Sequence, residues 1–160
     1  MAKNPDPIIE VTTLQGRTRP LDDWLTISHL CLVALPSRPE SQLYVPLGIR
    51  ALDAFQQADC KTAFLITGSE AQARRLLADD LNRFVVFLDP ERTLVESLGL
   101  TALPAFVHLR ADTTLVDAAE GWDPPAWQRV SAGLAAAMKW SQAVFPLAGD
   151  PPPHPGWAVS

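Results

Sequence analysis

Short hydrophobic runs alternate with amphipathic segments along most of the chain. Residues 30–35 and 63–67 are continuous apolar runs of strand length, which is typical of strands in a sheet covered on both faces. Residues 46–58, between them, carry apolar side chains at helical spacing and predict a helix. The pattern therefore predicts strands that alternate with helices, as in an α/β domain.

The same alternation continues on both sides of this unit. Residues 8–11 predict a short strand and residues 21–25 one helical turn, while Ser69 is the expected N-cap of a helix that ends near residue 81. A long helix over residues 126–140 should begin near Asp123. The remaining expected elements are a strand at 84–88, a short helix at 94–100, and two final strands at 106–109 and 115–119.

The proline of Leu103-Pro104 lies in the loop between that short helix and the next strand. This arrangement resembles the thioredoxin-like superfamily, in which the equivalent X-Pro peptide is cis and faces a Cys-x-x-Cys pair at a helix start. A cis X-Pro bond persists only where the fold demands it. With the added strand-helix unit over residues 63–81, the chain is most similar to the TlpA-like and peroxiredoxin-like branch, and the resemblance covers roughly residues 8–140.

The resemblance implies an α/β thioredoxin-like fold, with a central mixed sheet covered by helices on both faces. A chain of 160 residues normally forms one domain. We expect this domain over residues 1–142, with residues 1–28 as an N-terminal strand and turn extension. A Pro-rich C-terminal tail follows at residues 143–160.

The cysteine motif of the resembled family is absent. Counting back from Pro46, which is similar to the proline that kinks the active-site helix of the family, places Arg38 and Ser41 at the two cysteine positions. The motif is thus replaced by Arg38-Pro39-Glu40-Ser41, and Leu32 stands where thioredoxin has a buried acid. The resemblance therefore implies the scaffold and not the activity.

The replacement sequence has two interpretations. Ser37 to Glu40 fits the capping-box pattern, in which a serine hydroxyl and a glutamate side chain satisfy backbone N–H groups at a helix start. Such a cap contributes about 1 kcal/mol. In the second interpretation, Arg38 presents its guanidinium to an acidic group of a partner.

The two cysteines lie outside this motif. Cys31 falls within a predicted buried strand, where a free cysteine acts as a small hydrophobic residue. Cys60 stays a candidate reactive thiol because Lys61 is adjacent to it. Both cysteines should lie at the end of the sheet opposite the proline loop.

The three histidines, His29, His108 and His154, lie in separate segments. Their spacing matches no zinc site, and they predict neither a catalytic set nor a metal centre. His108 lies in a predicted core strand and is expected to be a satisfied buried polar group. We expect no cofactor.

Composition and charge narrow the class of protein. The chain is 48% hydrophobic and 19% charged, which describes a soluble globular protein. A net charge of −5 argues against a general nucleic-acid binder, which needs clustered lysine and arginine. The sequence shows no signal segment and no apolar run of about 20 residues, so we expect a cytoplasmic protein with reduced cysteines and no membrane insertion.

The tail differs from the rest of the chain in its proline content. Such a segment favours extended polyproline II structure, which is stiff and loses little entropy on docking. It is either a disordered tail or a docked one. In the second case Trp157 anchors it on this domain or on another chain.

Two function classes remain open. The first is a redox-inactive thioredoxin-like protein that binds a polypeptide, as an assembly factor, chaperone or accessory subunit, either as a homo-oligomer or in a larger complex. Thioredoxin-like hydrogenase-assembly chaperones also lack Cys-x-x-Cys, and residues 21–25, 103–105 and 121–127 are loosely similar to theirs. The second is a thiol-disulfide oxidoreductase-like enzyme that uses Cys60. In the first class the binding surface would comprise Arg38, Pro39, Glu40, Ser41, Leu103 and Pro104, with Trp157 as the tail anchor.

Overall fold

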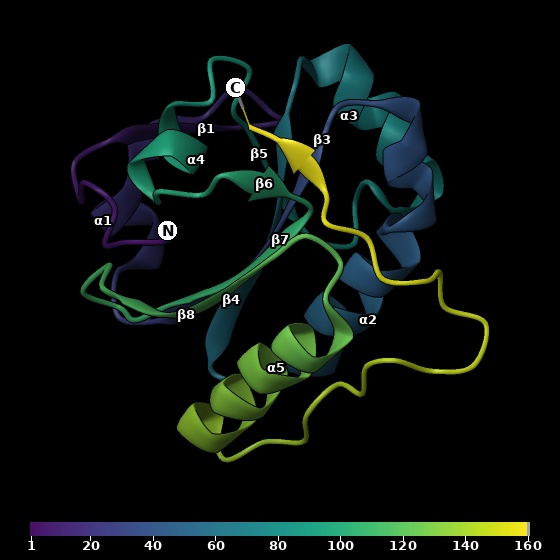
Figure 1. Cartoon of the computed structure of the whole chain (residues 1–160). Coiled ribbons are helices and arrows are strands. Elements are labelled where there is room, and N and C mark those ends of the chain that lie inside the picture. The colour runs from purple at the N-terminus through teal and green to yellow at the C-terminus, as the bar shows by residue number, and fades with distance from the viewer. Residues whose placement is uncertain (160) are drawn as a thin grey trace.

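The computed structural model describes residues 1–159. A seven-stranded mixed sheet lies at the centre of the fold (Figure 1). The strand order is β2-β1-β5-β4-β3-β7-β8. The strands are β1 (Glu10–Thr13), β2 (Thr18–Pro20), β3 (His29–Pro36), β4 (Cys60–Thr67), β5 (Val85–Leu88), β7 (Ala105–Leu109) and β8 (Leu115–Glu120). The pairs β3–β4 and β4–β5 are parallel, whereas β1, β7 and β8 pair antiparallel with their neighbours.

Helices cover both faces of this sheet (Figure 1). On one face lie α2 (Val45–Phe55), α3 (Glu70–Leu77) and α5 (Pro124–Met138), and on the other lie α1 (Leu21–Leu25) and α4 (Thr93–Ser97). Two 3-10 helices, η1 (Pro39–Leu43) and η2 (Ala78–Asp80), complete the helical segments of the described chain. This is the α/β architecture that the sequence predicts.

The continuous apolar run of β3 is explained by its position in the middle of the sheet. Cys31, Val33 and Leu35 pack into the core beneath α2 and α5. Leu30, Leu32 and Ala34 point to the opposite core, against α1 and α4. Because successive side chains of a strand point to opposite faces, a strand between two helical layers must be apolar at every position.

Local signals fix several element boundaries. Ser69 caps α3 in a capping box with Gln72, and the Asp123 side chain accepts a hydrogen bond from the backbone of Ala126 at the start of α5. Both N-caps confirm the sequence-based prediction. The predicted strand at residues 8–11 begins two residues later, and β2, which pairs with it, was not predicted.

The C-terminal tail is docked on its own domain. It runs from the end of α5 past α2 to a two-stranded sheet, in which β9 (Trp157–Ala158) pairs antiparallel with β6 (Ala102–Leu103) (Figure 1, yellow). Phe145 belongs to the core under α2 and α5, whereas Val159 belongs to the core under α1 and α4. The tail therefore contributes side chains to both cores.

No helix within residues 1–159 is long and apolar enough to cross a membrane.

We predict that Phe145→Ala lowers the free energy of unfolding by about 3–5 kcal/mol, because it empties a well-packed aromatic site. The side chain is 4% exposed and lies against Phe106, Trp122 and Trp127. Urea unfolding followed by circular dichroism measures the change. The matched control is Leu147→Ala, at a tail side chain that is 48% exposed, which should cost under about 0.5 kcal/mol. Equal effects of the two substitutions would contradict the docked tail.

Candidate functional site

The segment from Arg38 to Ser41 follows the carboxyl end of β3 and begins η1. Arg38 is the N-cap residue, and Pro39 fills the first turn, where a backbone N–H would have no intrahelical partner. Tyr44 ends η1 and begins α2, so Pro46 lies in the first turn of α2. The expected proline kink is therefore replaced by a junction between two separate helices.

The predicted capping box at Ser37 and Glu40 is wrong. The Ser37 hydroxyl donates to the Thr67 carbonyl at 2.9 Å, which ties the end of β3 to the end of β4. The Glu40 carboxylate accepts a hydrogen bond from the Arg38 guanidinium at 3.0 Å. Both side chains have partners outside the reciprocal pattern that a capping box requires.

Ser41 is sealed inside the protein. Its side chain is fully buried, and its hydroxyl donates to the Pro36 carbonyl at 2.6 Å. The residue at the second position of the replaced motif therefore ties η1 back to β3. A hydroxyl in this position does not reach a bound substrate.

The Leu103-Pro104 peptide is cis, as the family resemblance implies, and joins β6 to β7. The Pro104 carbonyl accepts a hydrogen bond from the backbone N–H of Gly121 at 2.7 Å. Glu120 fixes the other end of β6, because one of its carboxylate oxygens accepts from the N–H groups of Thr101 at 2.6 Å and Ala102 at 3.2 Å. β6 is thus held in place from both ends.

The tail strand occupies the edge of β6. In the antiparallel register Leu103 lies opposite Trp157, and Ala102 lies opposite Ala158. The N–H of Val159 donates to the Thr101 carbonyl at 3.1 Å and extends the pairing by one residue. The edge beside the cis proline accepts an extended strand, and here that strand comes from the chain itself.

Aromatic and cationic side chains meet over this pairing. The Arg38 guanidinium lies 4.5 Å from the centre of the Trp157 ring. Tyr44 meets the same ring edge-on at 5.8 Å, and His154 lies beside it at 4.8 Å. A small cavity of about 170 Å³ is left where Arg38, Leu103 and Trp157 converge. The structure therefore brings these three predicted site residues together, with Pro39 and Glu40 exposed nearby.

Two further contacts secure the tail before it reaches β6. The Arg50 guanidinium donates to both oxygens of Asp150, at 2.6 and 2.8 Å, and these bonds lower the pKa of the Asp150 carboxyl. The indole N–H of Trp122 donates to the Pro151 carbonyl at 2.8 Å. Trp122 also exchanges backbone hydrogen bonds of 2.8 and 3.0 Å with His154. The sequence does not predict the ion pair of Arg50 and Asp150, because opposite charge is the only feature that relates two residues so far apart in the chain.

The two cysteines lie on neighbouring strands, at the end of the sheet opposite β6, as predicted. Both are free thiols. Burial raises the pKa of Cys31, and the neighbouring Cys60 raises it further. Burial, with a contribution from Asp59, raises the pKa of Cys60 to about 11. This environment is the reverse of one that activates a thiol.

Two histidines form a pair that sequence analysis did not anticipate. His29 on β3 and His108 on β7 are joined by a hydrogen bond of 2.8 Å between Nδ1 of His29 and Nε2 of His108. His108 is 1% exposed, and its Nδ1 finds no hydrogen-bond partner within residues 1–159. The expectation that His108 is fully satisfied is therefore wrong. The pairing of β3 with β7, which places His108 opposite Cys31, was the signal that could have located the pair.

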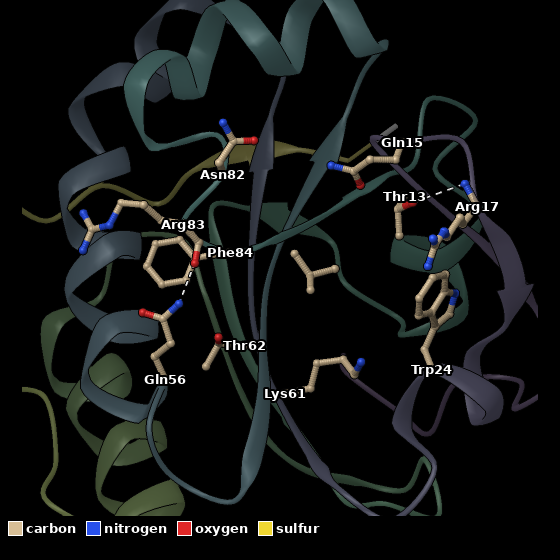
Figure 2. Close-up of a pocket in the computed structure, with 11 residues that line it drawn as sticks. Thr13, Gln15, Arg17, Trp24, Gln56, Lys61, Thr62, Asn82, Arg83 and Phe84 are labelled. Carbon is tan, nitrogen blue, oxygen red and sulfur yellow. Dashed lines mark hydrogen bonds between the residues drawn. The ribbon is translucent and has the colours of Figure 1, made fainter.

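A cleft of about 610 Å³ opens around the starts of β4 and β5, away from β6 (Figure 2). Two of its three cations have partners. The Lys61 ammonium lies 5.7 Å from the Trp24 ring centre. Arg83 pairs with Asp53 at 3.2 Å and with Asp80 at 3.1 Å, and its guanidinium points away from the cleft in Figure 2. No cluster of three or more potential ligands within the described residues could hold a metal ion. The candidate site therefore stays at β6.

The solved structures show what this fold is similar to. A protein named as a thiol:disulfide interchange protein of the DsbE type, from Chlorobium tepidum, superposes with a TM-score of 0.69 at 16% identity, over 86% of this chain and 98% of its own. A protein named as a thioredoxin from Neisseria meningitidis gives 0.68 at 16% identity, over 87% and 92%. Peroxiredoxin Q from Xanthomonas campestris gives 0.63 at 16% identity, over 82% and 89%.

The chain therefore has a thioredoxin-like fold, of the kind seen in DsbE-type and peroxiredoxin Q-type proteins. No protein-family model matches the sequence, and no curated protein sequence matches it. The similarity identifies the fold alone.

The burial of His108 makes stability depend on pH. Burial lowers the pKa of His108 to about 4, and His29 and Arg110 act in the same direction. An unfolded chain binds the same proton with a pKa near 6.5. Because the unfolded state binds more protons between these values, the stability from a neutral His108 is complete above about pH 6.5 and is lost as the pH falls toward 4.

We predict that His108→Leu flattens the pH dependence of the unfolding free energy between pH 6.5 and pH 4. Between pH 6.5 and pH 4 the unmodified protein should lose more unfolding free energy than His108→Leu does, by on the order of 3 kcal/mol. Urea titrations at a series of pH values measure it. His154→Gln, which leaves His108 unchanged, should keep the original slope. An unchanged slope in His108→Leu would show that other groups cause the acid sensitivity.

Proposed function

We propose that this protein is a redox-inactive thioredoxin-like protein that binds a polypeptide partner, as an assembly factor, a chaperone or an accessory subunit of a complex. The observation that carries the proposal is that β6 already bears an added strand, beside a helix start that supplies no thiol. Backbone pairing at a strand edge is a general mode of peptide recognition. The surface would consist of this edge with Arg38, Pro39, Glu40, Leu103 and Pro104, and Trp157 as the anchor of the docked tail. Ser41, the remaining residue of the replaced motif, is buried and would support this surface from within.

The chemistry around the edge supports binding rather than turnover. Arg38 and Trp157 are the kinds of side chain that dominate interface energies. Ser41, at the second motif position, is buried and bonded to the backbone, so it offers no nucleophile to a bound chain. The partner would be another protein or a second copy of this chain, and the proposed compartment is the cytoplasm.

A thiol-disulfide oxidoreductase-like enzyme that uses Cys60 is the second candidate. The names of the structural neighbours favour it, because they include a thiol:disulfide interchange protein and a peroxiredoxin. The position of Cys60 favours it less. The thiol donates a weak hydrogen bond of 3.5 Å to the Phe55 carbonyl and lies at the far end of the sheet from the cis proline.

We predict that the protein does not reduce insulin with dithiothreitol and does not consume peroxide, because no thiolate is stabilised at the start of η1. A Cys31→Ala, Cys60→Ser double variant should capture the same partner as the unmodified chain. Alanine is used at position 31 because a serine hydroxyl would be buried there. Turnover that exceeds the dithiothreitol blank and disappears in the double variant would establish the second candidate instead.

Labelling kinetics test Cys60 directly. In a Cys31→Ala background, Cys60 should react with iodoacetamide at pH 7.5 on the order of 100-fold more slowly than free cysteine, because a pKa of about 11 leaves little thiolate. Mass spectrometry of quenched samples gives the rate, and the urea-unfolded protein is the control that should react at the free-cysteine rate. A folded-state rate equal to that control would mean that Cys60 is an accessible, reactive thiol.

A further inference from the structure

The tail strand shows what the edge of β6 selects. Its pairing with Ala102 and Leu103 uses backbone groups, which bind an extended segment of almost any sequence. Specificity must therefore come from side chains and from steric limits along the strand. Residues 156–159, Gly-Trp-Ala-Val, meet such limits at three of their four positions.

The first position tolerates only glycine. Gly156 has φ +82°, and a Cβ built there would lie 2.5 Å from the Leu103 carbonyl oxygen and 3.1 Å from the Gly121 Cα. These are backbone atoms, which cannot rotate away. Gly121 is equally constrained from the other side, since its own Cβ would meet the Pro155 carbonyl oxygen at 2.7 Å. Two backbone segments of the protein lie so close together here that neither has room for a side chain.

The second position takes an aromatic ring. The Arg38 guanidinium lies over the Trp157 ring, 4.5 Å from its centre, and the Tyr44 ring contacts Trp157 edge to face at 5.8 Å. A guanidinium over an indole face is the favoured cation–π arrangement. An aliphatic side chain would leave the guanidinium without this partner.

The third and fourth positions follow the alternation of a strand. Ala158 points to solvent and imposes no selection. Val159 is 7% exposed and packs into the core under α1 and α4, in the same cluster as Leu103. The fourth position therefore takes an aliphatic side chain of limited size.

We propose, building on the polypeptide-binding function above, that the site recognises an extended segment of another protein with the pattern Gly-aromatic-any-aliphatic. Residues 156–159 are an internal copy of that segment, which the partner must displace. The tail is suited to displacement because residues 146–149 and 152–153, in the stretch before it, are exposed. In that stretch, Asp150 and Pro151 supply the side-chain hydrogen bonds to the rest of the domain. As a tethered competitor it acts at a high effective concentration and excludes weak ligands.

The test uses the full chain and a fluorescent peptide with the sequence of residues 153–159, Pro-His-Pro-Gly-Trp-Ala-Val, and measures fluorescence anisotropy. Trp157→Ala in the protein weakens the internal competitor and should tighten peptide binding at least tenfold relative to the unmodified chain. The same peptide with alanine in place of its glycine or its tryptophan should bind this variant at least tenfold more weakly. Equal affinity of the variant and the unmodified chain, or of the three peptides, would overturn the proposal.

A second variant tests whether the effect of Trp157→Ala comes from misfolding. Asp150→Asn loosens the tail at a distance from the three selective positions, and it should also tighten binding of the unchanged peptide. Arg74→Ala, on the exposed surface of α3, is the matched control and should have no effect. Light scattering measures whether the tail is exchanged between two copies of the chain. If the unmodified protein is a tail-swapped dimer and Trp157→Ala is a monomer, the pattern binds a second copy of this chain. That result would overturn the assignment to another protein.

The outcomes separate this inference from the function on which it rests. One outcome is that the peptide binds neither Trp157→Ala nor Asp150→Asn while the protein still captures a partner and shows no thiol turnover. That result would rule out the recognition pattern and leave the proposed function in place. Cysteine-dependent turnover would remove the proposed function, whatever the peptides show.

Discussion

The backbone pairing of β6 with β9 is the interaction on which the candidate site depends. An unpaired strand edge exposes N–H and C=O groups that bind other strands, and proteins usually cover or interrupt such edges. Here β6 stands apart from the seven-stranded sheet and is covered by residues of the same chain. The pairing also places Trp157 under Arg38 and Val159 in the core. The tail therefore pairs with β6 and fills the core at the same time. A competing strand must supply both the backbone hydrogen bonds and the buried side chain.

The absence of cysteine from residues 38–41 has a structural counterpart at the start of η1. Where a reactive group would have to face the cis proline, Arg38 turns to Glu40 and Trp157, and the Ser41 hydroxyl bonds to the Pro36 carbonyl. These contacts fix the segment in place, although Nε of Arg38 is buried and has no hydrogen-bond partner within residues 1–159. A rigid edge with aromatic and cationic neighbours favours recognition of a chain, because less ordering is required when the partner binds.

Sequence patterns predicted the parts of this structure that depend on near neighbours. The apolar runs of β3 and β4 and the Ser69 cap follow from residues within a few positions of each other. The cis peptide at Pro104 was implied by the resemblance to the thioredoxin-like superfamily. The capping box at Ser37 failed because Thr67, 30 residues away, offers its carbonyl to the same hydroxyl. The histidine pair joins residues 79 positions apart, and the Arg50–Asp150 pair joins residues 100 apart. Contacts of that kind become visible only when the strand order is known.

The two glycines at the crossing of the tail and β8 show how such an edge limits its occupants. Gly121 and Gly156 face each other where the tail passes the end of β8, and a side chain on either one would collide with backbone rather than with a movable group. Repulsion of this kind rejects strands that carry a side chain at this position, and it adds to specificity because specificity is a difference between affinities. An open edge would bind many strands weakly. The close backbone approach, the aromatic position under Arg38 and the aliphatic position beside Leu103 together restrict the edge to a narrow set of sequences, of which the tail is one.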